Sequence, residues 1–203
     1  LGGSNQQVPA IEYANRQGYY TILCDYLPDN PGQHYADKFY CVSTTDQEAI
    51  LEVAQKERVD GIVAYASDPA APTAAYVAER LGLQTNPYKS VELLTNKDKY
   101  RSFLEKHNFN TPKAKGYSSF VQANTEIEEF TLPVIIKPVD SSGSKGVCKL
   151  TDVQDFEELF EHAISFSKAR RVIIEEFVDK SGYQVAGDGF SVNGELVFRC
   201  FAK

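Results

Sequence analysis

Short apolar runs alternate with helical patterns through the first 95 residues, and this alternation constrains the fold more than any other feature. Apolar or β-branched runs predict strands at 19–23, 38–42 and 62–65, and amphipathic spacing predicts helices at 8–16, 47–58 and 68–81. Strands that alternate with helices are typical of βαβ units around a parallel sheet. We therefore predict an α/β fold with a Rossmann-like domain over residues 1–95.

The start of this domain also allows a dinucleotide-binding interpretation. Gly2 and Gly3 lie where such a fold keeps its glycine turn, and Asp25 ends the next predicted strand. The full G-x-G-x-x-G pattern is absent, because Ser4 and Gln7 stand where glycines are needed. An NAD-dependent dehydrogenase and a plain strand–helix turn both remain alternatives at this point.

Composition excludes several classes of protein. The 203 residues are 42% hydrophobic and carry a net charge of −7, without a basic stripe that would indicate a nucleic-acid partner. The apolar runs are too short to span a membrane, and no signal peptide is evident. Four scattered cysteines contain no C-x-x-C pair, which argues against a zinc site or a disulfide framework and suits the cytoplasm.

A second feature, at residues 134–146, points to an anion site. A short apolar run reads as a buried strand that ends at Lys137 and Pro138. Seven small, polar and flexible residues follow and include Lys145. Backbone N–H groups in such a turn can form a concave anion site, so the stretch predicts a cradle for polyphosphate. A hairpin turn with surface lysines is the alternative interpretation.

The remaining pattern is that of a mixed α+β region. Asn96 opens an amphipathic helix, residues 147–150 pair back as a hairpin, and a helix is predicted at 153–168. A strand at 172–178 runs into Glu175 and Glu176, a pair that could also be a solvated acidic face. Strands at 183–192 and 195–201 are joined by Asn193-Gly194, the strongest short hairpin signal.

In this order and at these intervals, the motifs resemble those of the ATP-grasp superfamily. Asp98-Lys99 resembles the first phosphate lysine, and Lys137 with the following loop resembles the strand lysine and flexible glycine-rich loop. Ile174 to Val178 resembles the hinge that holds adenine. The chain is most similar to carbamoyl phosphate synthetase and biotin carboxylase relatives, including phosphoribosylglycinamide synthetase and carboxyaminoimidazole ribonucleotide synthetase.

The resemblance implies a domain organisation and a set of site residues. Residues 1–95 would be the pre-ATP-grasp domain, and 96–203 the ATP-grasp lid (about 113–177) with the beginning of the catalytic subdomain. Val134, Ile136 or Val147 could form apolar walls around adenine. The implied ATP-binding residues are Lys99, Lys137, Ser142, Gly143, Ser144, Lys145, Gly146, Glu175, Glu176, Phe177, Val178 and Gln184, the last standing where relatives often have a glutamate. Substrate candidates are Gly3, Ser4 and Asp25.

The resemblance further implies an ATP-dependent carboxylate–amine ligase that uses ATP and Mg²⁺ on small-molecule substrates and forms a homodimer. A non-catalytic nucleotide-binding module is the alternative. The magnesium ligands of the family are expected beyond Lys203, so no metal-binding residue is assigned in this chain. Because the chain lacks methionine and starts at Leu1, we also expect a trimmed piece of a longer protein that is inactive alone.

Overall fold

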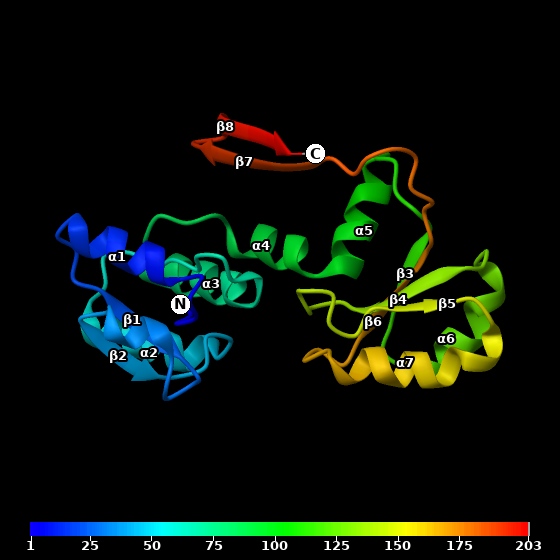
Figure 1. The fold of residues 1–203 in the computed structure, drawn as a ribbon, viewed down its shortest axis with the longest axis horizontal. Coiled ribbons are helices and arrows are strands. Elements are labelled where there is room, and N and C mark those ends of the chain that lie inside the picture. The colour runs from blue at the N-terminus through cyan, green and yellow to red at the C-terminus, as the bar shows by residue number, and fades with distance from the viewer. Residues whose placement is uncertain (203) are drawn as a thin grey trace.

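The computed structural model describes residues 1–202, in which the strands form three separate sheets (Figure 1). A parallel pair lies in the N-terminal part, a four-stranded antiparallel sheet follows, and an antiparallel hairpin ends the described chain. Helices α4 (Tyr88–Thr95) and α5 (Lys97–Lys106) lie between the first two of these regions. Helix α4 was not predicted from the sequence.

The N-terminal region contains the parallel pair and three helices. Strands β1 (Ile22–Asp25) and β2 (Lys38–Cys41) pair with Ile22 opposite Lys38. The helices are α1 (Val8–Arg16), α2 (Gln47–Glu57) and α3 (Ala71–Leu81), with short 3-10 turns at Pro31–His34 and Asp68–Ala70. Residues of β1, α2 and α3 bury a small core, which explains the helical spacing of the sequence: Cys24, Ile50, Leu51, Ala54 and Val77.

The prediction of a buried strand at residues 62–65 was wrong. This segment belongs to no strand among the described residues, and Val63 is 63% exposed. Its Val63 carbonyl accepts a hydrogen bond from the amino group of Leu1 (2.8 Å), while Gly2 N–H donates to Cys24 on the other side (2.9 Å). An apolar run needs a paired strand along its length to form a ladder, whereas here the hydrogen bonds come from the Leu1 amino group to Val63 and from the Gln7 side chain to Tyr65.

The central sheet has the strand order β3-β6-β4-β5, with each neighbouring pair antiparallel. Its strands are β3 (Ala114–Tyr117), β4 (Val134–Pro138), β5 (Cys148–Leu150) and β6 (Val172–Glu176). The predicted β4–β5 hairpin is confirmed by the pairing of Val134 with Leu150, whereas β3 was not foreseen. Helix α6 (Phe120–Glu126) leads through a 3-10 turn at Ile127–Glu129 to β4, and a 3-10 turn at Val153–Asp155 precedes α7 (Phe156–Ser165).

The two faces of this sheet have different neighbours. Alternate strand residues such as Val134, Ile136 and Ile174 are buried against α6 and α7, where Phe156 and Phe160 are almost fully enclosed. Helix α5 packs on β3 and β6, and the charged residues that follow the opposite alternation face this side. Because side chains of a strand alternate between faces, one short sequence supplies both a core face and a polar face.

The terminal hairpin consists of β7 (Ala186–Val192) and β8 (Glu195–Ala202). Its turn is the predicted Asn193-Gly194 pair, with φ of 51° and 83°, the positive values that a tight hairpin turn needs. Each described residue of both strands is exposed, and the hairpin lies apart from the central sheet in Figure 1. Within residues 1–202, no helix has the length and apolar character needed to cross a membrane.

Candidate functional site

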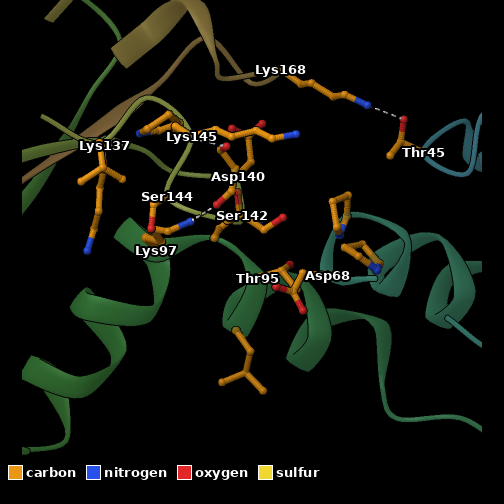
Figure 2. A pocket seen from close by; sticks show the side chains of 18 of the residues that line it. Thr45, Asp68, Thr95, Lys97, Lys137, Asp140, Ser142, Ser144, Lys145 and Lys168 are labelled. Atoms are coloured by element: carbon orange, nitrogen blue, oxygen red, sulfur yellow. Dashed lines mark hydrogen bonds between the residues drawn. The ribbon is translucent and has the colours of Figure 1, made fainter. Parts of the chain in front are cut away.

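A cavity of about 800 Å³ lies between the central sheet and the N-terminal region (Figure 2). Its first wall is the end of β4, the loop after it, and Glu175 of β6. The start of α5 forms the floor through Asn96 and Lys97, and the opposite wall comes from the N-terminal region through Thr45, Asp68 and Pro69. The cavity thus joins segments that are far apart in the sequence.

Lys137 enters this cavity from the end of β4. Its ammonium forms an ion pair with the Glu175 carboxylate, and the two side chains are only 17% and 8% exposed. Glu175 also accepts a hydrogen bond from Arg101 Nε of α5 at 3.0 Å through its second oxygen. The strand lysine predicted from sequence therefore lies in the cavity, within a mostly buried cluster of two cations and one carboxylate.

Lys97 is the cavity residue that sequence reasoning missed. Its backbone N–H donates to the Val139 carbonyl at 3.0 Å, and its ammonium donates to the Ser141 carbonyl at 2.5 Å. Burial, followed by the charge of Lys137, holds the pKa of Lys97 below its usual value of 10.5. Two cations facing one cavity provide the charge that a polyphosphate needs.

Lys99, which the sequence pointed to, does not line the cavity. Its ammonium pairs with Glu92 at 2.9 Å, and both side chains are about 40% exposed. Two positions along a helix turn a side chain by roughly 200°, so Lys97 and Lys99 lie on opposite faces of α5. A shift of two residues is within the uncertainty of a motif comparison. The sequence signal that pointed to Lys97 was its position directly after Asn96, the residue that begins the helix.

The loop after β4 borders the cavity through Ser142, Gly143, Ser144 and Lys145. Gly143 and Ser144 have φ of 66° and 57°, the left-handed region that glycine adopts without strain. The predicted loop residue Gly146 lies buried at the base, where an added Cβ would come within 2.9 Å of Phe166 and Pro138.

The other end of this loop is fixed by Asp140. Its two carboxylate oxygens accept hydrogen bonds from Ser167 Oγ (2.7 Å) and Ala169 N–H (2.8 Å). The neighbouring Lys168 then reaches across to Thr45 Oγ1 of the N-terminal region at 2.8 Å (Figure 2). The loop therefore has anchored ends and an exposed tip, a geometry that suits a cover over phosphates.

The predicted adenine hinge is only partly next to the cavity. Glu175 lines the cavity, but Glu176, Phe177 and Val178 do not. The Phe177 N–H donates to the Pro133 carbonyl at 3.1 Å. The Lys149 ammonium lies 3.8 Å from the centroid of the Phe177 ring, in a cation–π contact. Gln184 is exposed between β6 and β7 and does not line the cavity.

Two of the three predicted apolar walls are elsewhere. Val134 and Ile136 are fully buried in the core under α7, and only Val147 lines the cavity. Ile135 lines it in their place. The prediction was wrong for Val134 and Ile136 because the strand alternation that turns Lys137 toward the cavity turns these two residues away from it.

The predicted substrate residues form a separate cluster near β1. Asp25 is buried, and its two oxygens accept hydrogen bonds from the N–H groups of Gly3 (2.7 Å) and Leu27 (2.9 Å). Ser4 N–H donates to the side chain of Gln7 at 3.0 Å. These contacts hold two loops together, and none of the three predicted residues lines the cavity of Figure 2.

Comparison with known proteins agrees with this geometry. The family model described as D-ala D-ala ligase C-terminus matches residues 80–194. A formate-dependent phosphoribosylglycinamide formyltransferase of Saccharolobus solfataricus is 31% identical over 83% of this chain and 43% of its own length. The corresponding Methanocaldococcus jannaschii protein is 27% identical over 88% of this chain and 47% of its own length.

Solved structures show the same fold. An L-amino acid ligase from Bacillus licheniformis aligns with a TM-score of 0.72 at 25% identity, over 95% of this chain and 46% of that one. N5-carboxyaminoimidazole synthetase from Staphylococcus aureus, complexed with ADP, aligns with a TM-score of 0.67 at 19% identity, over 88% of this chain and 46% of that one. The chain thus spans less than half the length of these relatives. Because the family model matches more than half of the chain, the chain belongs to the D-ala D-ala ligase C-terminus family of the ATP-grasp enzymes.

Proposed function

We propose that the protein is an ATP-dependent ligase that activates a carboxylate as an acyl phosphate for attack by an amine. The observation that carries this proposal is the meeting of Lys97 and Lys137 with the Ser142–Lys145 loop around one cavity. Lys137 is balanced by Glu175, whereas the contacts described within residues 1–202 pair the Lys97 ammonium with carbonyl oxygens and with no carboxylate, so an anionic ligand would compensate for the desolvation of its charge.

In the proposed reaction, the two lysines and the loop hold the triphosphate of ATP. An oxygen of the substrate carboxylate attacks the γ-phosphorus, and ADP leaves with the electron pair of the broken P–O bond. The amine then attacks the carbonyl carbon of the acyl phosphate, inorganic phosphate leaves, and the amine loses a proton. The protein contributes position and charge neutralisation, which dominate catalysis in phosphoryl transfer.

Binding of the nucleotide base is proposed along the end of β6. In this proposal the backbone of residues 176–178 meets the adenine, with Gln184 near the ribose. The role of the Glu175 carboxylate toward adenine remains a prediction, since both of its oxygens are engaged by Lys137 and Arg101 in this structure. We further propose the division into a Rossmann-like domain (1–95) and an ATP-grasp part (96–203, lid about 113–177), of which Lys203 lies outside the described residues.

The substrate class is proposed from the relatives. One relative is named for formate and another for L-amino acids, and both compounds have a carboxylate. We propose a small-molecule carboxylate and amine as substrates, with Gly3, Ser4 and Asp25 as the candidates for contact. A homodimer and a cytoplasmic location are proposed from the family resemblance alone.

Magnesium is likewise proposed from the family. Within residues 1–202, no three His, Cys, Asp or Glu side chains come together in a way that could hold a metal ion. The steps above use only the lysines and the loop of this chain.

A calorimetric titration of the full-length protein with ADP in magnesium buffer tests the proposal. Lys97→Ala and Lys137→Ala should each weaken ADP binding by about tenfold or more, because a charge-assisted hydrogen bond contributes roughly 1.5–3 kcal/mol. Lys99→Ala is the matched control on the other face of α5 and should change the affinity by less than about twofold, as expected for an exposed ion pair.

Two results would contradict the proposal. If the wild-type protein does not bind ADP, the cavity is not a nucleotide site. If it binds ADP but shows no carboxylate-dependent ATP turnover with any panel of small carboxylates and amines, the non-catalytic module is correct instead. A separate result concerns the choice of lysine: if Lys99→Ala weakens binding while Lys97→Ala does not, the assignment of the two lysines is reversed.

A further inference from the structure

The cluster of Arg101, Glu175 and Lys137 contains two cations around one carboxylate. Arg101 Nε and Lys137 Nζ each contact a different oxygen of the Glu175 carboxylate. The exposed fractions of the three side chains are 27%, 8% and 17% for Arg101, Glu175 and Lys137. The carboxylate is therefore deeply buried and depends on both cations.

This geometry creates a competition for Lys137. An ammonium held by a carboxylate is available to a phosphate only if it leaves or shares that carboxylate. Removing one partner from a buried ion pair leaves an uncompensated charge, which costs far more than the pair contributes. If Glu175 had only Lys137, the binding of phosphate by Lys137 would leave the carboxylate without a counter-charge.

Arg101 removes this cost because it stays with Glu175. Its planar guanidinium presents hydrogen-bond donors in a fixed geometry that matches a carboxylate. The acidic residue one turn earlier on α5, Asp98, does not compete for it, since Asp98 pairs with Arg171. Lys97, the other cation near Lys137, directs its ammonium to the Ser141 carbonyl. Among the described contacts, Arg101 is thus the cation that can neutralise Glu175 when Lys137 turns away.

We propose that Arg101 is a positioning residue that neutralises Glu175 and so frees Lys137 for the phosphates of the nucleotide. The inference rests on the proposed function, since it presumes that Lys137 binds phosphate. Arg101 itself is not assigned a contact with ATP. Its effect should be specific to the phosphates, should act through Glu175, and should disappear when Glu175 loses its charge.

Titrations of the full-length protein with ADP and with adenosine test these three properties. Arg101→Ala should weaken ADP binding by about tenfold and leave adenosine affinity within about twofold. In a Glu175→Gln background the carboxylate is absent, so the same Arg101→Ala change should cost less than about twofold for ADP. Such non-additivity is the signature of two residues that act as one unit.

Two further variants serve as controls. Arg16→Ala removes an exposed arginine at the end of α1 and should leave both affinities unchanged, which controls for the loss of net positive charge. If Arg101→Ala fails to fold, Arg101→Gln replaces it. That variant keeps a hydrogen-bond donor but not the charge, and it should weaken ADP binding by about tenfold while sparing adenosine.

Three results would overturn the inference while the proposed function stands. ADP affinity could be unchanged in Arg101→Ala or, if that variant does not fold, in Arg101→Gln. Adenosine affinity could fall together with ADP affinity, which would indicate a general structural role. The loss could also persist in full in the Glu175→Gln background, which would indicate long-range attraction by Arg101. By contrast, absence of ADP binding in the wild-type protein would remove the proposed function itself.

Discussion

The two faces of the central sheet are built from the same strands but do different work. On the face under α6 and α7, Val134, Ile136 and Phe160 are fully buried and make apolar contacts. On the other face, Lys137 and Glu175 are also mostly buried, but they form an ion pair next to a cavity. Neighbouring residues of β4 thus have different roles: Ile136 belongs to the core, and Lys137 lines the cavity.

The difference shows where stability and binding are separated in this molecule. Apolar burial on the core face contributes roughly 25 cal/mol per Å² and does not depend on a ligand. Buried charges on the cavity face contribute little net stability, because desolvation offsets their attraction, and they are therefore better explained by binding. Substitutions on the two faces should accordingly have separable effects on unfolding and on nucleotide affinity.

The largest expected effect comes from the core face. Phe160→Ala should lower the free energy of unfolding by about 3–5 kcal/mol, because a fully buried aromatic ring leaves a cavity that the neighbours fill only in part. Urea denaturation followed by circular dichroism measures it. Phe109→Ala, at a side chain that is 60% exposed, is the matched control and should cost less than about 1 kcal/mol. Equal losses for the two variants would mean that the core face is not packed as described.

A substitution at the base of the loop after β4 should affect both the stability of the fold and the affinity for ADP. Gly146 has φ of 71°, and a Cβ there would lie 2.9 Å from Phe166 and Pro138, so Gly146→Ala should cost about 2–4 kcal/mol and also weaken ADP binding. Gly143→Ala has a similar φ of 66° but open space around it, and should cost only about 1 kcal/mol. Denaturation and ADP titration of both variants separate the effect of the steric contact at Gly146 from the effect of backbone strain. Identical losses of stability and affinity in the two variants would mean that the positive φ alone causes them.

The smallest expected effect is a pH dependence on the cavity face. Burial lowers the pKa of Lys97 below 10.5, so in the free protein this lysine loses its proton at a lower pH than an exposed lysine. Bound phosphate favours the charged form, so ADP affinity should be full below the lowered pKa and fall as pH rises from there toward 10.5. We expect about a twofold fall across the alkaline range that the protein tolerates.

The lowered pKa of Lys97 also predicts how the stability of the fold changes with pH, and a Lys97→Arg variant provides a control for the ADP measurement. The unfolded chain holds the Lys97 proton to a higher pH than the folded chain, so this group makes folding more favourable as pH rises toward 10.5. Lys97→Arg keeps its charge throughout, so the alkaline fall in ADP affinity should disappear in that variant. Persistence of the fall in Lys97→Arg would assign it to another group.

Local patterns in the sequence predicted much of the secondary structure. The Asn193-Gly194 turn, the β4–β5 hairpin and a helix within residues 153–168 are confirmed. Helix α4 and strand β3 were not predicted, and the strand predicted at residues 62–65 does not form. Short segments depend on their neighbours rather than on their own pattern.

The site was predicted in part. The strand lysine and the small-residue loop were identified by their composition, since a chain needs those residue types wherever a backbone cradle is built. Lys97 lines the cavity and the predicted Lys99 does not, because a shift of two residues in a motif comparison changes the face of a helix. Glu175 was expected at adenine, yet its carboxylate contacts two cations.

The sequence by itself determined the alternation of the strands, the hairpin turns and the composition of the loop, because these follow from side-chain period and backbone freedom within a few residues. Only the tertiary structure decided which face of α5 meets the cavity, that Arg101 and Lys137 share Glu175, and that Thr45 meets Lys168. Those pairs are separated by 38 to 123 positions, and no local pattern specifies which distant side chains will meet across packed elements.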